Sequence, residues 1–356
     1  MRTFYRRGAI LASLAAVVGL QSCAVNEKGG SPSPSPSPSP AASFSETSTI
    51  SRENGVIVER VAYLSGDLRI AGEVCRPDDN ARHPVVLWNH GGFEGIGSVD
   101  RDFCQRSARA GYVAGLSQYR GEGGSAGMIE FCNGEVDDVD RMLTILAAQP
   151  YADSSRLASL GASHGGCITT RLALRRPTLR AAVDIVGPGD LAILYNWWVD
   201  QLARNEPFCR SIGKSGCAEQ HGIYVAVATA ALGGPPALRP DGYALRSPTR
   251  TLSQLRVPML FIHGTYDEIV TVDQTCAKRT ALESAGRTVQ SWMIDNQYRP
   301  QPDSSACGGR FRSDAVPSAL SDDLYVFLYD RQGHSLSPAT IDAAWSLTLS
   351  FLASHL

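Results

Sequence analysis

The feature that most constrains the fold of this chain is its alternation of short apolar runs with segments of helical spacing. The run Pro84–Trp88 is apolar throughout, which is typical of a parallel strand buried on both faces. In the segment Glu135–Ala148 the apolar side chains recur three or four residues apart and share one face of a helix. Repeated units of this kind predict an α/β fold: a mostly parallel twisted sheet, helices on both faces, and a ligand site at the carboxyl ends of the strands.

The other expected elements follow the same pattern. The expected strands are Val56–Leu64, Leu68–Cys75, Tyr112–Ser117, Leu157–Leu160, Leu179–Val186, Val257–Ile262 and Asp323–Leu328. The expected helices are Asp100–Ala110, Cys167–Arg175, Asp273–Ala285 and a last one that ends at Leu352. Two irregular stretches, about 190–253 and 287–322, interrupt the alternation, and we expect them to form a cap and a lid.

Residues 1–22 have the pattern of an export signal. Three arginines among the first seven residues precede the apolar run Ala9–Leu20, which has the length of a signal-peptide core and is too short to span a membrane. The four residues that end at Cys23 resemble a bacterial lipobox, which implies a lipid on Cys23 and a cell-envelope location. The alternatives are an ordinary secreted protein cleaved nearby and a twin-arginine signal.

A Ser-Pro repeat over residues 31–40 separates this signal from the rest of the chain. Proline favours extended polyproline II structure, so we expect residues 23–50 to be a lipidated N-terminus and a semi-rigid spacer. We expect one folded domain, 51–356, to follow it.

The nine cysteines agree with export. Without Cys23 their number is even, which favours up to four disulfides in an oxidising compartment. Closeness in sequence suggests the pairs Cys209–Cys217 and Cys276–Cys307 and leaves the pairing of the other four open. There is no C-x-x-C motif and the histidines lack ligand spacing, which argues against a structural zinc site. We expect no metal and no cofactor.

The charge balance excludes some classes of partner. Thirty-three basic and 35 acidic residues give a net charge of −2, which argues against nucleic acid, whose phosphates require a concentrated basic surface. No stretch reaches the roughly 18 consecutive apolar residues of a spanning helix. We therefore expect contact with a membrane only through the lipid anchor.

A short glycine-rich segment between an expected strand and an expected helix is the first candidate for chemistry. Gly161-Ala162-Ser163-His164-Gly165 fits the pattern G-x-S-x-G in the strand–turn–helix context of a nucleophile elbow. The tight turn requires glycine on both sides and exposes the Ser163 hydroxyl. Because a serine hydroxyl is a weak nucleophile at neutral pH, it requires a base, and the base requires an orienting acid.

Two later loops supply the acid and the base in the order that such an elbow requires, serine, acid, histidine. Asp267 follows the strand expected at 257–262 and His334 follows the strand expected at 323–328, so both lie at the same sheet edge as Ser163. Glu268, beside Asp267, is a rival for the role of acid. The sequence predicts Ser163, Asp267 and His334 as a catalytic triad.

The same chemistry requires donors for the oxyanion that forms on the substrate carbonyl. One backbone N–H is expected from His164, the residue after the nucleophile. A second is expected from the loop after Trp88, at Gly92 or Phe93. Glycine there lets the backbone approach the substrate closely.

These segments together resemble the α/β-hydrolase fold and, within it, the catalytic domain of the prolyl oligopeptidase family. They run in the family's order from about Val85 to the C-terminus. The segments are His90-Gly91-Gly92, Gln118–Gly124, Glu135–Val139, Gly161–Gly166, His263–Asp267 and Gly333-His334. The resemblance implies a serine hydrolase of small-molecule esters or peptides, with Ser163 as nucleophile, Asp267 as orienting acid and His334 as base.

Two departures from that family favour a stand-alone esterase over a peptidase. The roughly 35 residues between Ser51 and Val85 are too few for the propeller domain that family peptidases usually carry. His164 stands where such peptidases often have an aromatic residue. A peptidase of the same family and a catalytically silent envelope-binding lipoprotein remain the alternatives.

Overall fold

A ten-stranded sheet organises residues 43–356, the part of the chain that the computed structural model describes. The expected signal peptide, Cys23 and the Ser-Pro spacer lie outside the described residues. The first strand begins ahead of Ser51, where we expected the domain to start. The strands are β1 Glu46–Glu53, β2 Val56–Ser65, β3 Leu68–Pro77, β4 His83–Asn89, β5 Val113–Ser117, β6 Ala152–Ala162, β7 Ala181–Ile185, β8 Met259–Gly264, β9 Gln290–Ile294 and β10 Leu324–Tyr329.

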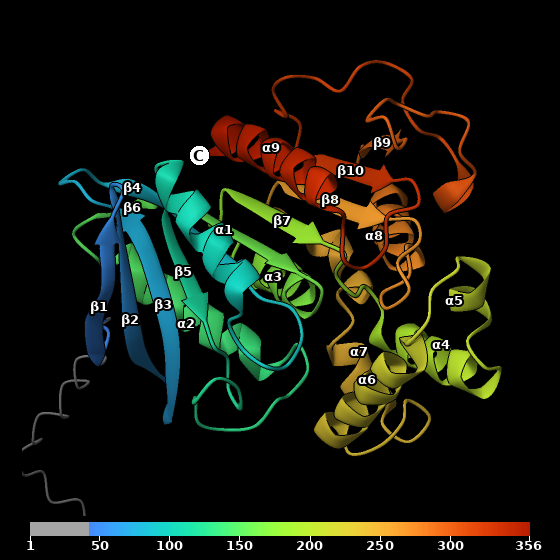
Figure 1. The fold of residues 1–356 in the computed structure, drawn as a ribbon, viewed down its shortest axis with the longest axis horizontal. Helices are drawn as coiled ribbons and strands as arrows, with labels where there is room; N and C mark the ends of the chain where they lie inside the picture. The colour runs from blue at the N-terminus through green and yellow to red at the C-terminus, as the bar shows by residue number, and fades with distance from the viewer. Residues whose placement is uncertain (1–42) are drawn as a thin grey trace, which may run out of the picture. The chain divides into compact units, whose positions relative to one another are not determined.

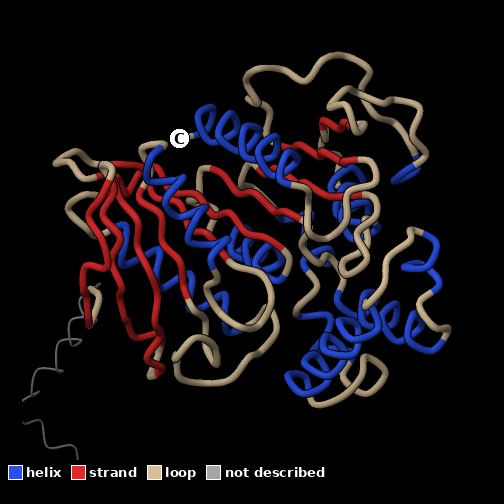
Figure 2. Tube along the Cα trace, in the orientation of Figure 1, coloured by secondary structure: helices blue, strands red, loops and turns tan. Residues whose placement is uncertain are grey.

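The sheet is parallel except at one end. Its spatial order is β1-β2-β3-β5-β4-β6-β7-β8-β10-β9, and the pairings from β5 to β9 are parallel. The pairings among β1, β2, β3 and β5 are antiparallel and form the left part of the sheet in Figures 1 and 2. The expected mostly parallel sheet is therefore confirmed, and the carboxyl ends of β4, β6, β8 and β10 meet at one edge.

Helices cover both faces of the sheet, as the alternation predicts. On one face, α1 (Ser98–Arg109) and α9 (Pro338–His355) cross the strands in the foreground of Figure 1. On the other face lie α2 (Gly134–Ala147), α3 (His164–Arg175) and α8 (Asp273–Ser284). Strands such as β10, in which every residue is buried, receive apolar packing from both sides, which explains their unbroken apolar sequence.

The stretch 190–253, which we expected to be irregular, is mostly helical. Its helices are α4 Leu191–Ala203, α5 Pro207–Ser211, α6 Cys217–Leu232 and α7 Pro240–Leu245, and we call these helices and the loops between them the cap. Only three residues of α6 are buried, and its apolar side chains do not keep to one face. The periodicity that identifies an amphipathic helix is therefore absent from the sequence.

The second irregular stretch, 287–322, belongs partly to the sheet. It contains β9, which pairs with β10 at the sheet edge and which the sequence analysis missed. None of its described residues lines the two cavities beside the candidate site. The strand β9 is therefore part of the sheet and not of a lid, contrary to our expectation for this stretch.

Four disulfides cross-link the described residues. The expected pairs Cys209–Cys217 and Cys276–Cys307 are confirmed. The remaining pairs are Cys75–Cys104, between β3 and α1, and Cys132–Cys167, which joins α3 to the segment before α2. Four disulfides suggest an extracellular or periplasmic protein. Among the described residues, no helix has the length and apolar character needed to cross a bilayer.

Candidate active site

Ser163 occupies a strained turn between β6 and α3. Its backbone adopts φ 55° and ψ −122°, a conformation that non-glycine residues rarely take and that tends to occur at functional sites. The turn is so tight that a Cβ on Gly161 would lie 2.3 Å from the Gly165 oxygen, and one on Gly165 would lie 2.0 Å from the Asn89 oxygen. Both glycines of the G-x-S-x-G pattern are therefore required sterically.

The structure brings Ser163, His334 and Asp267 into one hydrogen-bonded chain. His334 Nε2 lies 2.9 Å from Ser163 Oγ, and His334 Nδ1 lies 2.8 Å from Asp267 Oδ2. Because a carboxylate can only accept, Nδ1–H donates to Asp267 and Nε2 is left to accept the Ser163 hydroxyl proton. The three side chains come from loops after β6, β8 and β10, as their positions in the sequence predict.

Asp267 is fully buried and tightly held. Its Oδ1 accepts the backbone N–H groups of Ile269 at 2.9 Å and Val270 at 2.8 Å. His263 Nε2 lies 3.2 Å from its Oδ2. Burial alone would raise the pKa of Asp267, but the charges and hydrogen bonds of His334 and His263 outweigh it and hold the pKa well below its usual range. The carboxylate is therefore ionised throughout the neutral range.

The environment of His334 favours its protonated form. Burial would lower the pKa of His334, but the negative charge and hydrogen bond of Asp267 outweigh burial and raise that pKa above its ordinary value. The charge of Glu268 raises it further, whereas that of Lys214 lowers it. A histidine so placed can take a proton from Ser163 and return it to a leaving group.

Glu268, the rival acid, contacts a different part of His334. Its Oε2 accepts the His334 backbone N–H at 3.1 Å and pairs with Lys214 Nζ of the cap at 2.6 Å. The imidazole instead contacts Asp267. Glu268 therefore supports the loop that carries the imidazole.

The expected oxyanion donors lie around Ser163. Gly91 packs so closely that a Cβ on it would lie 3.0 Å from the Ser163 Cβ, and Gly92 has a positive φ of 69°. His164 is the first residue of α3, where backbone N–H groups have no partner within the helix. Gly92 and Phe93 thus lie on the loop beside Ser163 and His164 lies at the start of α3, where we expect two N–H groups to bind a carbonyl oxygen.

The side chain of His164 has a role that the sequence analysis missed. Its Nε2 accepts the Cys132 backbone N–H at 2.9 Å, and its Nδ1–H donates to the Gly92 carbonyl at 3.2 Å. Burial lowers the pKa of His164 to about 4, so the ring is neutral and can accept at one nitrogen while donating at the other. His164 therefore anchors the loop that carries Gly92 to the segment before α2.

Three other residues also went unassigned from the sequence. Gln118 Oε1 accepts the Ile96 N–H at 2.8 Å and Glu122 Oε2 accepts the Gly95 N–H at 2.9 Å, and these bonds brace the same loop. Burial raises the pKa of Glu122 to about 8. Burial raises the pKa of Tyr224 in the cap, and the nearby Ser163 hydroxyl acts in the opposite direction. Gln118 and Glu122 lie in the segment Gln118–Gly124, which carried the family resemblance but gave neither residue a role, and Tyr224 lies in the cap, where the sequence contained no signal.

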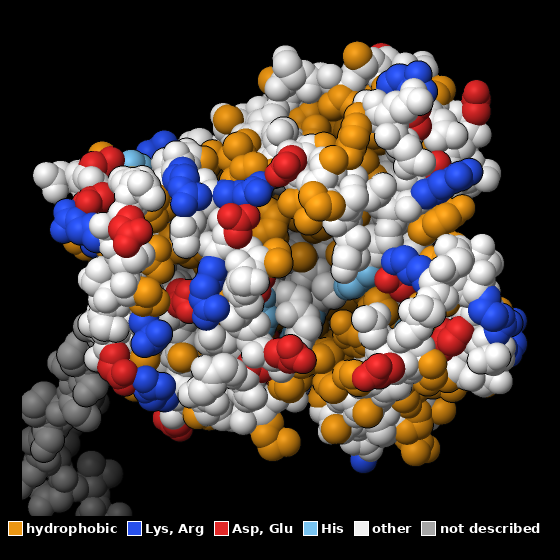
Figure 3. All heavy atoms as spheres, viewed as in Figure 1, with side chains coloured by type: hydrophobic (Ala, Val, Ile, Leu, Met, Phe, Trp, Pro, Cys, Tyr) orange, Lys and Arg blue, Asp and Glu red, His pale blue; other side chains and the backbone are white. Residues whose placement is uncertain are grey.

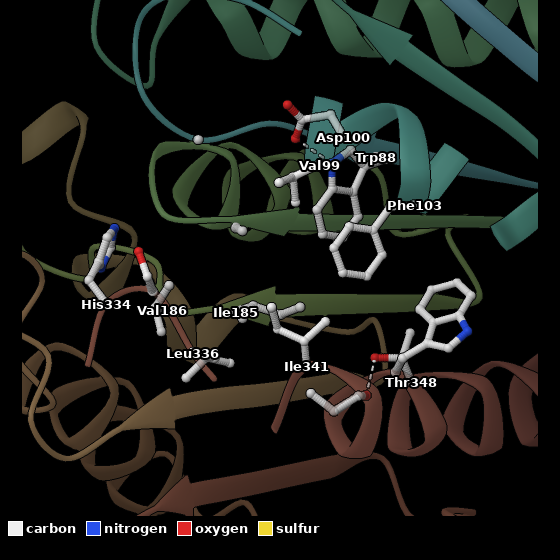
Figure 4. Close-up of a pocket in the computed structure, with 15 residues that line it drawn as sticks. Trp88, Val99, Asp100, Phe103, Ile185, Val186, His334, Leu336, Ile341 and Thr348 are labelled. Atoms are coloured by element: carbon white, nitrogen blue, oxygen red, sulfur yellow. Dashed lines mark hydrogen bonds between the residues drawn. The ribbon is translucent and has the colours of Figure 1, made fainter. Parts of the chain in front are cut away.

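Two cavities meet at His334. The first, which we call the cap cavity, has a volume of about 340 Å³ and lies between α6 and the loop of Gly92 and Phe93, with Glu268 in its wall. Figure 3 shows a hollow in this part of the molecule, in which histidine atoms are visible. The second, the α1–α9 cavity, has a volume of about 280 Å³ and contains no cap residue (Figure 4). Both cavities therefore border His334.

The described residues contain one grouping of possible metal ligands, Glu206 with Cys209 and Cys217. The two sulfurs form a disulfide, so neither is available as a thiolate ligand. This grouping therefore offers a metal ion only one carboxylate.

Two sequence comparisons match this chain to peptidases. A family model described as X-Pro dipeptidyl-peptidase (S15 family) matches residues 65–215, a range that includes Ser163 but not Asp267 or His334. An uncharacterized peptidase, YtmA of Bacillus subtilis (strain 168), is 24% identical over 233 residues, which cover 65% of this chain and 82% of the relative.

Solved structures show the same fold. An acylaminoacyl peptidase of Pyrococcus horikoshii matches with a TM-score of 0.60 at 17% identity, over 85% of this chain and 42% of the peptidase. An acetyl xylan esterase from Paenibacillus sp. R4 matches with a TM-score of 0.59 at 15% identity, over 87% of this chain and 88% of the esterase. This chain therefore spans less than half of the peptidase chain. The expected α/β-hydrolase fold and resemblance to prolyl oligopeptidase-like hydrolases are confirmed, and the comparisons support a serine hydrolase.

Proposed function

We propose that this protein hydrolyses carboxylic esters through a Ser163–His334–Asp267 triad and an acyl-enzyme intermediate. The observation that carries the proposal is the continuous chain of hydrogen bonds, 2.9 Å from Ser163 Oγ to His334 Nε2 and 2.8 Å from His334 Nδ1 to Asp267. It has the donor–acceptor order that makes a serine hydroxyl nucleophilic.

In the first half of the reaction, Ser163 Oγ forms a bond to the substrate carbonyl carbon while its proton passes to His334 Nε2. Asp267 stabilises the imidazolium that results. The carbonyl oxygen becomes an oxyanion, which the N–H of Gly92 or Phe93 and that of His164 stabilise. The bond to the leaving group then breaks, and His334 protonates the departing oxygen. Water repeats these steps on the acyl-enzyme and restores the Ser163 hydroxyl.

We attribute the rate of the proposed hydrolysis to two features of this site. The strained Ser163 backbone fixes the hydroxyl at the sheet edge, so the nucleophile is already in position when substrate binds. The oxyanion loop is braced by the side chains of His164, Gln118 and Glu122, so its donors are positioned before substrate arrives.

A peptidase is the second candidate function. The match to the X-Pro dipeptidyl-peptidase model favours it, as does the cap cavity, whose wall includes the carboxylates of Glu94 and Glu268. Carboxylates attract the positively charged amino terminus of a peptide. Turnover of p-nitrophenyl acetate compared with that of peptide p-nitroanilides separates the two functions.

The test of the nucleophile is covalent labelling with a fluorescent active-site phosphonate. We expect the wild type to be labelled and Ser163→Ala not to be, because the phosphorus atom bonds to the activated Oγ. Ser125→Ala serves as the matched control, since Ser125 lies outside the site and binds the Ala71 backbone. Labelling that survives in Ser163→Ala would overturn the assignment, and a wild type that never reacts would favour the catalytically silent binding protein.

We further propose that a lipid on Cys23 anchors this hydrolase to the cell envelope. The four disulfides support an oxidising location. Mass spectrometry of the mature protein should find Cys23 as the acylated first residue, and Cys23→Ser should release activity from the membrane fraction. An unmodified mature N-terminus elsewhere would favour the secreted alternative.

A further inference from the structure

The α1–α9 cavity extends from His334 into the apolar layer between the sheet and two helices. In Figure 4, Trp88 and Phe103 line one side and Ile185, Leu336 and Ile341 the other. His334 lies at one end and Thr348 at the far end. The cavity therefore connects the proposed general acid with a deep apolar space.

Three of the polar side chains that line this cavity, Trp88, Asp100 and Thr348, already have partners. Trp88 Nε1 donates to Asp100 Oδ1 at 2.8 Å, and the Gly97 N–H donates to Asp100 Oδ2 at 2.8 Å. Thr348 Oγ1 donates to the Ala344 carbonyl at 2.8 Å. The rest of the lining is mostly apolar, so a group that enters the cavity gains mainly apolar contact.

Size and shape indicate a compact aromatic occupant. The volume of about 280 Å³ exceeds the roughly 150 Å³ of an apolar cavity that binds benzene. The rings of Trp88 and Phe103 stack with centroids 4.2 Å apart, and Trp345 meets Phe103 edge-on at 5.7 Å. A six-membered ring on a one-carbon linker fits this volume and can pack against these aromatic walls.

The backbone that forms the cavity is held in an unusual conformation. Val186, in the wall beside Ile185, has a positive φ of 49°, which is unfavourable for a β-branched residue. Its N–H donates to the Ile262 carbonyl of β8 at 2.8 Å, which holds it in place. Strain of this kind persists where surrounding structure maintains it, and it is common at ligand sites.

We propose that the α1–α9 cavity binds the alcohol side of the substrate and makes the enzyme selective for esters of compact aromatic alcohols, such as benzyl esters. This inference rests on the proposed function. The leaving alcohol must lie beside His334, which protonates it. His334 and Ser335 line both cavities and Leu336 lines only this one, whereas the expected oxyanion donors Gly92 and Phe93 line only the cap cavity. The acyl group accordingly lies toward the cap.

The test compares three esters with the full-length enzyme. Benzyl acetate and ethyl acetate share one acyl group, and ethyl phenylacetate carries the ring on the acyl side. We expect kcat/KM for benzyl acetate to exceed that for ethyl acetate by about tenfold or more, the effect of burying one ring. Ethyl phenylacetate should gain no such preference. Benzyl alcohol should act as a competitive inhibitor.

The variant that closes the cavity is Val99→Trp. Val99 lines the cavity and is 61% exposed, so a larger side chain there can fill the entrance without disturbing the core. We expect this variant to lose most of the benzyl preference and to bind benzyl alcohol more weakly. The matched control is Ile193→Trp on the cap helix α4, where Ile193 is 59% exposed and lines neither cavity. This control should keep the preference.

Each outcome decides the proposal. A ring preference that belongs to ethyl phenylacetate and disappears in Val99→Trp would assign the cavity to the acyl group and overturn our assignment. Equal turnover of all three esters, or an unchanged benzyl preference in Val99→Trp, would show that the cavity is not a subsite. If the phosphonate still labels Ser163 in that case, the proposed function is unaffected. A wild type that neither hydrolyses these esters nor reacts with the phosphonate would overturn both the proposed function and this inference.

Discussion

The loops at the strand ends and the cap that faces them are stabilised in different ways. Asp267 is fully buried and receives two backbone hydrogen bonds, and Ser163 sits in a turn that two glycines make possible. The cap, by contrast, exposes large apolar side chains on several helices and loops, visible as hydrophobic atoms at the lower right of Figure 3. These are Ile193, Val199, Ile223, Leu238 and Leu245.

This difference suggests that the strand-end loops carry out the reaction and that the cap modifies it. The strand-end loops hold their functional atoms at hydrogen-bond distances, so changes there should alter the rate of bond breaking. The cap reaches the site through few contacts, among them the ion pair of Lys214 with Glu268 and the side chain of Tyr224. Changes in the cap should therefore alter stability, pH response or selectivity.

The largest effect is expected from Asp267→Asn. An amide at this position no longer stabilises the imidazolium and favours the wrong tautomer of His334, so kcat should fall by about 10⁴-fold. Steady-state ester hydrolysis measures it. The matched control is Glu268→Gln, the neighbouring carboxylate, which contacts the His334 backbone rather than its ring and should cost far less. A larger loss in Glu268→Gln would identify that residue as the orienting acid.

A smaller effect is expected on stability when the cap disulfide is removed. Cys209→Ser with Cys217→Ser opens a loop whose ends are 8 residues apart and should lower the free energy of unfolding by about 2 to 3 kcal/mol. Cys276→Ser with Cys307→Ser opens a span of 31 residues outside the cap and should cost about 3 to 4 kcal/mol. Urea unfolding under oxidising conditions compares the two. A reversed order would mean that loop length does not govern their contribution.

The pH profile should have an acid limb set by His334. The neutral imidazole is the active base, and its pKa is raised above the ordinary value of about 6.5. As the pH is lowered, kcat/KM should therefore begin to fall while the pH is still above that value. Below the pKa it should drop about tenfold per pH unit. Asp267 stays ionised, so no second acid limb is expected in this range. A flat profile from about pH 5 to 8 would argue against His334 as the base.

The smallest effect is expected from Lys214→Met in the cap. The positive charge of Lys214 lowers the pKa of His334, so its removal should move the acid limb to higher pH by a few tenths of a unit. Lys214 is 37% exposed, and salt should therefore reduce the shift. Lys214→Arg, which keeps the charge, is the control. An acid limb that does not move would show that the cap has no electrostatic influence on the imidazole.

The sequence predicted the strand-end loops well and the cap poorly. Strands such as β4 and β10 and helices such as α2 were identified because their patterns are complete within about ten residues. The elbow around Ser163 was identified because its glycines meet a local steric requirement. In α6 the apolar residues are mostly exposed and do not keep to one face, so the sequence has no helical periodicity there. The strand β9 is short and lies at the edge of the sheet, and its sequence has no periodic signal either.

The sequence by itself determined the α/β alternation and the elbow, because each depends on residues that are close together in sequence. It also determined the order of serine, acid and histidine, because that order is a property of the linear chain. Only the tertiary structure decided that the imidazole contacts Asp267 rather than Glu268, that the His164 side chain braces the oxyanion loop, and that α1 and α9 enclose an apolar cavity. These features join segments that are far apart in the chain, and their contacts arise from three-dimensional packing, which leaves no pattern in a single sequence.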